Sequence, residues 1–422
     1  MRFLYSVAWW LALPLVLGRL WWRGRRESGY RQHLAERLGF YGRPGTSSPL
    51  IWVHAVSVGE TRAAEPLVDA LLQAWPSHAI LLTHMTPTGR ATGKALFGKH
   101  GSRVMQCYLP YDIGWMVRRF LRHYTPQLCV LMETEVWPNV IAQCVRQRVP
   151  VALVNARLSE RSLAKAKRLS TLMTEAAQRI TCVAAQTEAD AARIRQLGAP
   201  EVQITGSIKF DVTPPASLLE TGRALRALIG ARPVLLCAST RESEETLILD
   251  ALAGVDLRDA LVVIVPRHPQ RFDEVARLVA ARGFGMQRRS SLAGQPVAAD
   301  TRVLLGDSMG EMFAYYAACD VAFIGGSLLP LGGQNLIEAC AVGKPVLIGP
   351  HTFNFSAVSE DAIAAGAALR VADAAAMVER ARDLLQDEGK RSAMGQRAQA
   401  FAQQHRGATV RTIALLKPLI QP

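Results

Sequence analysis

Short apolar runs alternate with amphipathic helical patterns from residue 50 to the end of the chain. Such runs are typical of strands that are buried on both faces of a sheet. They predict strands at residues 50–54, 79–83, 104–109, 128–132, 151–154, 180–184, 202–204, 234–237, 261–265, 303–305, 321–324, 346–348 and 368–371. Helices are predicted between them, including 60–74, 86–97, 113–122, 136–148, 335–342, 374–386 and 390–405. This alternation indicates the α/β class, with doubly wound parallel sheets.

The alternation is interrupted at residues 206–230, which include Thr213-Pro214-Pro215. A chain of 422 residues also suits two domains better than one. We therefore predict an N-terminal segment at 1–30, a first domain at 31–205, an interdomain linker at 206–230 and a second domain at 231–422 that ends in helices. Two such domains facing each other would place a ligand cleft between the carboxyl ends of their strands.

The first apolar run, residues 3–22, is about as long as a membrane-spanning helix. Pro14 and Arg19 interrupt it, and tryptophans lie toward both of its ends. The basic side chains that follow it directly are Arg23, Arg25 and Arg26. A secretory signal carries its positive charge before the run instead. The positive-inside rule therefore favours an uncleaved anchor, spanning the bilayer or lying in its interface, with the rest of the chain in the cytoplasm. A buried amphipathic helix is the alternative.

The net charge of +14 belongs to the first half of the chain. Residues 1–210 hold 27 Lys and Arg against 13 Asp and Glu, whereas residues 211–422 hold 22 of each. Nucleic acid, an anionic membrane surface or a phosphorylated lipid would each explain this asymmetry, and a basic surface that only aids solubility is the alternative. Aromatic residues make up only 7% of the chain, which disfavours a nucleic-acid partner.

The seven cysteines are scattered and form no Cys-x-x-Cys pair, which predicts reduced, buried thiols and neither a disulfide framework nor a zinc site. The chain also lacks a phosphate-binding P-loop, a zinc-protease His-Glu-x-x-His and a serine nucleophile elbow. It has no Asp-x-Asp of the kind that metal-dependent sugar transferases use. We therefore expect neither a metal ion nor a cofactor.

In the second half, several turns that follow strands carry chemistry suited to anions. Gly332 and Gly333 precede the helix predicted at 335–342, whose free N–H groups and dipole would favour a phosphate. Asn335 and Glu338 would share a face of that helix, where Glu338 can accept hydrogen bonds from sugar hydroxyls. Arg241, Arg267 and the segment 307–311 follow other strands and lie on the same rim. Together they favour a nucleotide site over an ordinary strand–turn–helix unit.

In the first half, the candidates are carboxylates at the carboxyl ends of strands. Glu60 lies at a glycine turn after the first strand, and Glu133 and Glu135 follow the strand at 128–132. A carboxylate placed there can take a proton from an attacking hydroxyl. The alternatives are stabilisation of a helix dipole by Glu60 and an arginine ion pair for Glu133.

Motifs along nearly the whole chain closely resemble the 3-deoxy-D-manno-octulosonic acid (Kdo) transferases of lipopolysaccharide synthesis. In order, the motifs are HAVSVGE (54–60), TPTG (86–89), YLPYD (108–112), METEVWPN (132–139), NARLSERS (155–162), GSIKFD (206–211), PRHPQRF (266–272), GDSMGEM (306–312), GGSLLPLGGQNLIEA (325–339) and GPHTFNF (349–355). The resemblance implies the GT-B fold, which consists of two Rossmann-like domains facing a central cleft. It also implies an enzyme that transfers Kdo from CMP-Kdo to a tetraacyl disaccharide bisphosphate lipid A precursor, with inversion at the anomeric carbon. The acceptor would bind to the first domain, at the cytoplasmic face of the inner membrane.

The resemblance also implies roles for particular residues. Glu60 matches the proposed catalytic base of the family, and Glu133 and Lys209 match residues thought to assist the transition state. The segments that match CMP contacts contain Pro266, Arg267, Met309, Gly310, Glu311, Asn335, Leu336, Ile337 and Glu338. Arg241, Gly332 and Gly333 join them as donor-binding candidates on the chemical grounds above.

Two positions depart from the family pattern beside the expected nucleotide site. Gln334 replaces a usual His, and Leu336-Ile337 replaces a usual Pro-Leu, while Asn335 and Glu338 are retained. Two other functions stay open. One is another GT-B enzyme that uses a UDP-sugar, on a lipid acceptor or by isomerising the sugar. The other is a non-catalytic protein of the membrane surface.

Overall fold

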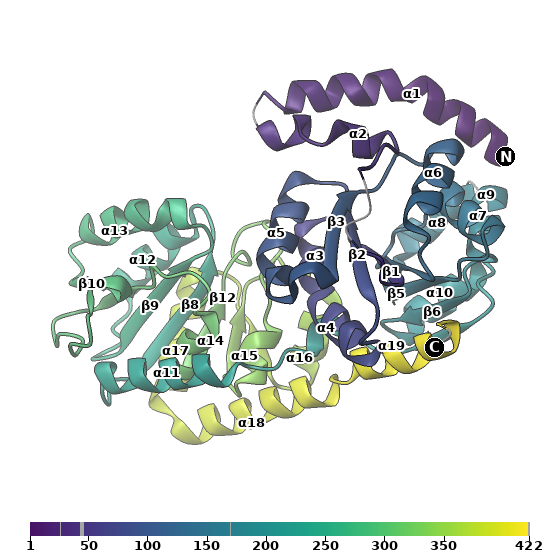
Figure 1. Cartoon of the computed structure of the whole chain (residues 1–422). Helices are drawn as coiled ribbons and strands as arrows, with labels where there is room; N and C mark the ends of the chain where they lie inside the picture. Colours follow the sequence, from purple (N-terminus) through teal and green to yellow (C-terminus); the bar gives the residue numbers. More distant parts are fainter. Residues whose placement is uncertain (26, 43–45, 169, 421–422) are drawn as a thin grey trace. The chain divides into compact units, whose positions relative to one another are not determined.

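The computed structural model describes residues 1–25, 27–42, 46–168 and 170–420. Arg26, part of the predicted basic flank, lies outside these described residues. The chain divides into two compact units: unit 1 comprises Met1–Asp211 and Arg406–Pro422, and unit 2 comprises Val212–His405. In each unit a parallel sheet lies between layers of helices (Figure 1).

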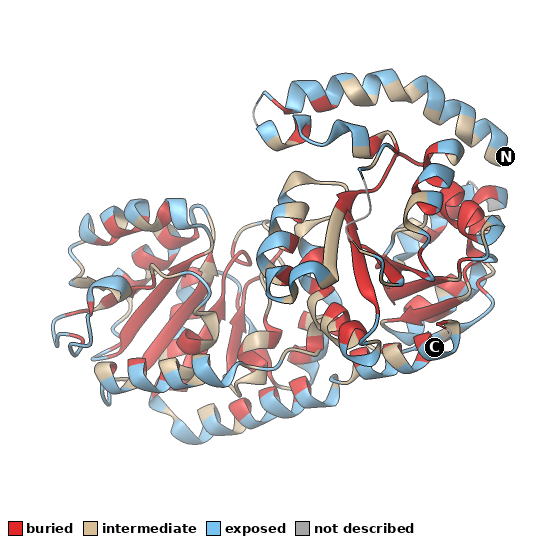
Figure 2. Ribbon diagram, viewed as in Figure 1, coloured by how far each residue is buried: buried red, intermediate tan, exposed pale blue. Residues whose placement is uncertain are grey.

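Unit 1 contains a seven-stranded sheet in the order β3-β2-β1-β4-β5-β6-β7, and all neighbouring strands are parallel. The strands are β1 (Leu50–His54), β2 (Ala79–His84), β3 (Val104–Tyr108), β4 (Leu128–Met132), β5 (Val151–Ala156), β6 (Cys182–Ala185) and β7 (Val202–Ile204). The central strands are buried along their whole length because helices cover both faces, as the red strands of Figure 2 show.

The helices of unit 1 pack on two apolar layers, one on each face of its sheet. Ile51 and Val53 point into one layer, and Trp52 points into the other, as the two-residue period of a strand requires. The helices are α1 (Arg2–Arg23), α2 (Leu34–Arg37), α3 (Val58–Ala63), α4 (Glu65–Ala74), α5 (Pro87–Phe97), α6 (Gly114–Tyr124), α7 (Pro138–Arg146), α8 (Glu160–Arg168), α9 (Ser170–Ala177), α10 (Glu188–Gln196) and α19 (Ala408–Leu416).

Unit 2 repeats the plan with a parallel sheet in the order β10-β11-β9-β8-β12-β13-β14. Its strands are β8 (Val234–Thr240), β9 (Leu261–Pro266), β10 (Met286–Arg288), β11 (Val303–Leu305), β12 (Val321–Ile324), β13 (Val346–Ile348) and β14 (Ala368–Arg370). Its helices are α11 (Ala216–Ile229), α12 (Glu244–Gly254), α13 (Phe272–Ala280), α14 (Met312–Ala318), α15 (Ile337–Ala341), α16 (Ser356–Ala364), α17 (Ala374–Gln386) and α18 (Glu388–Gln404).

The apolar pattern predicted the strands of both sheets well. Every strand that it predicted is present, and the one it missed, β10, is a half-buried edge strand whose Gln287 and Arg288 are polar. All seven cysteines are buried and unbridged, as their spacing predicted.

The predicted linker at 206–230 differs from the structure over residues 216–229, which form α11. This helix packs closely on α14: a Cβ added to Gly222 would lie 2.5 Å from the Cβ of Ala317. The proline pair therefore precedes a helix, as proline often does. The chain passes between the units after Asp211, and it returns after His405.

The return of the chain to unit 1 was also missed, because the second domain was predicted to extend to residue 422. In α19, Ala408 and Leu416 are fully buried in the same apolar layer as Ile51. Asp211 holds the start of this segment: Oδ1 accepts a hydrogen bond from the backbone N–H of Gly407 at 2.5 Å, and Oδ2 accepts one from Thr409.

The predicted N-terminal helix is confirmed as α1, which is long and apolar enough to cross a membrane. Only Leu20 is buried among its residues, so the alternative of a buried amphipathic helix does not hold. Tyr5 attaches the helix to unit 1, because its hydroxyl donates a hydrogen bond of 2.9 Å to Asp112.

We predict that Asp211→Ala loosens the C-terminal segment while the sheet of unit 1 stays folded. The change leaves two backbone N–H groups without their acceptor, which costs about 1–3 kcal/mol for each group that stays buried. Hydrogen exchange across residues 406–420 should accelerate at least tenfold. Asp387→Ala, which removes the equivalent cap from α18, should accelerate exchange in α18 and leave residues 406–420 unchanged. Unchanged exchange in Asp211→Ala would contradict the assigned role of Asp211.

Candidate active site

Glu60 lies in the first turn of α3, directly after β1. Its carboxylate accepts hydrogen bonds from the backbone N–H of Val56 at 2.8 Å and from the hydroxyl of Ser57 at 3.0 Å. Ser57 in turn accepts from the backbone N–H of Glu60, which completes a reciprocal helix cap. Glu60 therefore helps to stabilise the start of α3. A carboxylate offers about four lone-pair directions, so two hydrogen bonds leave room for a substrate hydroxyl.

Glu133 follows β4 and lies between two cations. Its Oε1 is 3.2 Å from the Nζ of Lys209, and its Oε2 is 3.1 Å from the Nε of Arg157. The Glu133 side chain is 8% exposed, whereas those of Lys209 and Arg157 are 24% and 50% exposed. A nearly buried carboxylate is thus neutralised by two side chains that still reach solvent.

The parallel sheet explains why these three residues meet. Glu133 follows β4, Arg157 follows the neighbouring strand β5, and Lys209 lies in the turn Ile208–Phe210 beyond β7. Carboxyl ends of parallel strands share one edge of a sheet. Asn155 positions the Lys209 turn, because its side-chain oxygen accepts a hydrogen bond from the backbone N–H of Ile208 at 3.1 Å.

Sequence reasoning did not assign a role to Arg157, although it left open an arginine partner for Glu133. Arg157 could have been noticed because it lies just after a predicted buried strand, at the edge where the other candidates lie. The choice among several nearby arginines required the structure.

The carboxylates at this edge influence one another electrostatically. Burial raises the pKa of Glu60; the hydrogen bonds from Val56 and Ser57 oppose this shift, Glu133 adds to it, and Arg157 opposes it. The pKa of Glu135 is raised to about 7, chiefly by burial and then by the charge of Glu60. Neighbouring carboxyls with separated pKa values are typical of acid–base sites.

In unit 2, the turns after β8 and β9 place basic side chains close together. The backbone N–H of Arg267 donates to Thr240 at 2.9 Å, so the turn that follows Pro266 lies against the end of β8. Burial lowers the pKa of His268, and the charges of Arg241 and Arg267 lower it further. Basic side chains from both turns therefore act on His268, while the charge of Glu242 opposes them.

The glycine loop after β12 lies against Arg241. A Cβ added to Gly326 would lie 3.1 Å from Nε2 of Gln334 and 3.5 Å from Cγ of Arg241. Gln334, one of the two departures from the family pattern, is thus adjacent to a predicted donor-binding arginine. The backbone N–H of Gly333 closes the loop by donating to Gly326 at 2.6 Å.

The glycine-opened helix predicted at 335–342 is wrong at its start. The helix α15 comprises only Ile337–Ala341, and Gly332 and Gly333 belong to the loop, with φ of +94° and +75°. Asn335 lies before the helix: its Oδ1 accepts from the N–H of Ile337 at 3.0 Å, and its amide donates to Glu338 at 3.1 Å. The helix therefore begins two residues later than predicted, and Gly332 and Gly333 shape the loop that precedes it.

Two of the predicted donor contacts cannot be made by side chains. Leu336 and Ile337 are fully buried in unit 2, so only their backbone groups can face a ligand. The segment before α14 is more open: Met309 is 58% exposed, and Gly310 has a φ of +81°. Glu311 caps that segment, because it accepts a hydrogen bond from the Ser308 hydroxyl at 2.7 Å.

Glu244 organises this loop cluster, a role that no pattern in the sequence predicted. It is completely buried in the first turn of α12, and its carboxylate accepts from the backbone N–H groups of Arg241 at 2.9 Å, Gly326 at 2.5 Å and Leu328 at 3.0 Å. One side chain therefore fixes the turn after β8 and the loop after β12.

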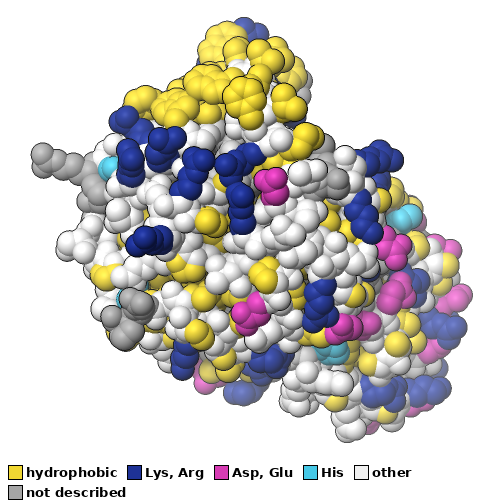
Figure 3. All heavy atoms as spheres, turned by 90° about the vertical axis from the view of Figure 1, so that its right-hand side faces the viewer, with side chains coloured by type: hydrophobic (Ala, Val, Ile, Leu, Met, Phe, Trp, Pro, Cys, Tyr) yellow, Lys and Arg dark blue, Asp and Glu magenta, His cyan; other side chains and the backbone are white. Residues whose placement is uncertain are grey.

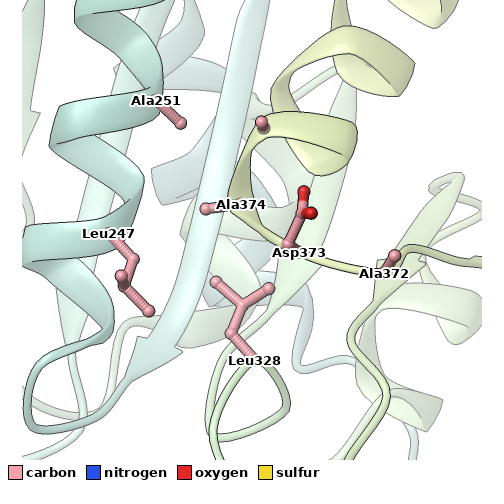
Figure 4. Close-up of a pocket in the computed structure, with 7 residues that line it drawn as sticks. Leu247, Ala251, Leu328, Ala372, Asp373 and Ala374 are labelled. Atoms are coloured by element: carbon pink, nitrogen blue, oxygen red, sulfur yellow. The ribbon is translucent and has the colours of Figure 1, made fainter.

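A cavity of about 320 Å³ in unit 2 has none of the predicted donor residues in its lining (Figure 4). It is lined mainly by Leu247, Ala251, Leu328 and alanines at the start of α17. Its one carboxylate, Asp373, caps α17 by accepting from the backbone N–H of Ala376 at 2.8 Å. An apolar cavity with one carboxylate is a poor fit for a nucleotide phosphate.

The residues that the structure describes contain no group of three or more His, Cys, Asp or Glu side chains that could hold a metal ion.

Known proteins are similar to the chain along its whole length. A family model described as 3-deoxy-D-manno-octulosonic-acid transferase (kdotransferase) matches residues 32–212, and a model of glycosyl transferases group 1 matches residues 289–401. The 3-deoxy-D-manno-octulosonic acid transferase of Bordetella pertussis is 46% identical over 99% of both chains. That of Haemophilus influenzae is 38% identical over 100% of this chain and 99% of its own. The chain belongs to the Kdo transferase family.

The crystal structure of Anabaena HepE in complex with UDP resembles the chain with a TM-score of 0.57. It is 16% identical and covers 88% of this chain and 100% of its own length, so it bears on the fold alone. With the two seven-stranded parallel sheets, it confirms the GT-B fold. The family resemblance drawn from the motifs is confirmed as well, and it places the chain among the transferases of lipopolysaccharide biosynthesis.

We predict that Glu244→Ala opens the glycine loop of unit 2, because three backbone N–H groups lose their acceptor. Each loss costs about 1–3 kcal/mol while the group stays buried. Hydrogen exchange of residues 325–335 should therefore accelerate by more than tenfold. Tryptophan fluorescence cannot follow this change, since all eight tryptophans lie in unit 1. Glu242→Ala, on the same turn but 51% exposed, is the matched control and should leave exchange unchanged.

Proposed function

We propose that this Kdo transferase uses CMP-Kdo as its donor and the tetraacyl disaccharide bisphosphate lipid A precursor as its acceptor. It would act at the cytoplasmic face of the inner membrane, without a metal ion or cofactor and without a nucleic-acid partner. The observation that carries the mechanism is the arrangement of Glu60 beside Glu133, Arg157 and Lys209 at one edge of the unit 1 sheet.

In the proposed reaction, Glu60 takes the proton from the attacking hydroxyl of the acceptor. The hydroxyl oxygen forms a bond to the anomeric carbon of Kdo while the bond from that carbon to the phosphate oxygen of CMP breaks. The electron pair leaves with CMP, and a single displacement of this kind inverts the anomeric centre. The raised pKa of Glu60 suits it to this step, because a base is most effective when its pKa approaches the working pH.

Glu133 serves to position charge in this proposal. It holds Lys209 and Arg157 in place through its two carboxylate oxygens. Kdo is itself an acid, so two partly exposed cations at this edge would attract its carboxylate and stabilise charge that develops during transfer.

The donor would bind to unit 2 at the rim formed by Arg241, Pro266, Arg267 and the glycine loop. The basic side chains favour the phosphate of CMP. Met309, Gly310 and Glu311 would add contacts from the neighbouring turn, as would the backbone of residues 332–337 and the carboxylate of Glu338. Support comes from the closeness of Arg241 and Arg267 to His268 and from the hydrogen bonds by which Glu244 fixes the turn and the loop together.

The placement at the membrane rests on α1. Its apolar side chains are exposed, with Phe3 at 79% and Leu15 at 78%, and the basic flank follows at Arg23 and Arg25. The excess positive charge of the first half suits an acceptor that carries two phosphates.

The decisive experiment is transfer to the purified lipid A precursor, with CMP-Kdo generated in situ and the product followed by mass spectrometry. The wild-type chain should add Kdo, and Glu60→Gln should lower the rate by about 10²–10⁴-fold, the usual effect of losing a general base. Glu65→Gln is the matched control, since Glu65 opens the next helix and pairs with Lys99 instead.

The outcomes of that experiment separate the alternatives. Full activity in Glu60→Gln would remove Glu60 as the base. No transfer by the wild type, with UDP-sugars but not CMP protecting the protein from proteolysis, would favour the enzyme with a UDP-sugar donor. Unchanged activity after chelation of divalent metals is expected, and loss of activity would contradict metal independence.

We predict opposite shifts of the acidic limb of the pH profile in two variants. The limb of kcat/KM should lie above the ordinary Glu pKa of about 4.3, because Glu60 must be ionised to act as a base. Arg157 lowers the pKa of Glu60, so Arg157→Gln should move the limb to higher pH. Glu133 raises it, so Glu133→Gln should move the limb to lower pH. Arg122→Gln, on the distant end of α6, should leave the limb in place, and shifts of the same sign in both site variants would refute the assignment.

A further inference from the structure

A second pocket lies in unit 1, away from Glu60 and its neighbours. It measures about 330 Å³ and lies between the start of α1 and the helices α6 and α7. Three arginines line it, one from each helix: Arg2, Arg118 and Arg146. Its volume falls at the lower end of the roughly 300–1,000 Å³ that is usual for small-ligand sites. Neither the family relationship nor the proposed reaction gives these residues a role.

Among the residues that the structure describes, none of the three arginines forms an ion pair with a carboxylate. The ion pairs of unit 1, in the part of the chain that the structure describes, engage other basic side chains: His33, Arg90, Lys99, His100, Arg157, Arg193, Arg195 and Lys209. Arg2, Arg118 and Arg146 thus bring three like charges to the lining of one pocket. Like charges that converge without a counter-ion are stabilised when an anion binds between them.

The backbone adds hydrogen-bond donors to the same pocket. Gly114 lines it and begins α6, an eleven-residue helix without a side-chain cap at its N-terminus. The start of α7 is different, because Asp112 already accepts from the N–H groups of Asn139 and Val140 at 3.0 and 2.8 Å. The free N–H groups at the start of α6 thus reinforce the field of the arginines, and they carry no carboxylate of their own.

The pocket also adjoins an apolar surface. Trp10 of α1 and Trp115 of α6 stack with ring centroids 6.2 Å apart, line the pocket and are 49% and 37% exposed. Phe3 lines the pocket as well, and Leu11, which follows Trp10 directly, is 74% exposed. Figure 3 shows this surface as a yellow cap above a row of dark blue basic side chains. Tryptophans between an apolar and a basic surface are typical of residues at a membrane interface.

We propose that this pocket binds the glycerophosphate headgroup of an anionic phospholipid. The phosphate would lie between Arg2, Arg118 and Arg146, and the acyl chains would leave along the exposed apolar side of α1. The apolar continuation selects a lipid over a free anion, and the arginines select an anionic headgroup over a zwitterionic one. The inference rests on the proposed membrane placement, but it is independent of the sugar-transfer chemistry.

The test uses the full chain and water-soluble lipids, so that binding to one pocket is separated from attraction to a charged bilayer. Calorimetric titration with dihexanoyl-phosphatidylglycerol below its micelle concentration should show saturable binding at one site. The variant Arg2→Gln, Arg118→Gln, Arg146→Gln should bind about 100-fold more weakly, at about fivefold per arginine near a lipid phosphate. The control Lys94→Gln, Arg122→Gln, Arg148→Gln loses the same charge outside the pocket and should stay within about threefold of wild type.

Each other result would overturn the proposal. Equal losses in the two triple variants would mean that diffuse charge alone attracts the lipid. Binding of dihexanoyl-phosphatidylcholine as tight as that of the phosphatidylglycerol would mean that only the apolar surface matters. Equally tight binding of inorganic phosphate would identify a site for a free anion. If the glutamine variant fails to fold by tryptophan fluorescence, replacement of the same three arginines by lysine keeps the charge, and loss of binding there would still exclude a headgroup site that depends on charge.

None of these readouts involves Kdo, so failure here leaves the proposed transfer reaction intact.

Discussion

The ion-pair cluster around Glu133 is the constraint on which the candidate site depends. A carboxylate that is 8% exposed is costly unless cations neutralise it, and here Lys209 and Arg157 do so. Both cations are drawn to one edge of the sheet, which fixes the segments after β5 and β7. Glu60 lies at the same edge, and its pKa depends on the charges of Glu133 and Arg157, which belong to other segments of the chain. The acid–base character of this edge is therefore a property of four segments that are far apart in the sequence.

Unit 2 also contains a buried carboxylate, that of Glu244, and backbone N–H groups stabilise it in place of cations. Glu244 has no cation partner among its hydrogen bonds, and three N–H groups satisfy it instead. Burial still raises its pKa, although these hydrogen bonds oppose the shift. Glu244 therefore fixes the turn that carries Arg241, while the Arg241 side chain itself pairs with the exposed Glu242 at 2.9 Å.

The sequence determined the sheets more fully than the sites. Buried strands such as Leu128–Met132 are continuous apolar runs, and their succession fixes a shared carboxyl edge, so the positions of Glu60 and Glu133 followed from the pattern. The edge strand β10 and the helix α11 were missed because Gln287, Arg288 and Pro214-Pro215 are locally atypical. The helix after Gly333 was predicted too long because Asn335 caps a later start. Partners such as Arg157 and Glu244 depend on tertiary contacts that no local pattern records.

The helix α1 packs on the rest of unit 1 while it keeps an exposed apolar surface. Only Leu20 is buried, and polar contacts hold the helix at its N-terminal end: Tyr5 donates to Asp112, whose carboxylate also caps α7. Burial raises the pKa of Asp112 to about 6, although the hydrogen bonds from Asn139, Tyr5 and Val140 favour its ionised form. Protonation of Asp112 would therefore weaken the hydrogen bonds that attach the helix. Asp112 precedes α6, caps the start of α7 and accepts from Tyr5, so one buried carboxylate joins the beginnings of three helices of unit 1.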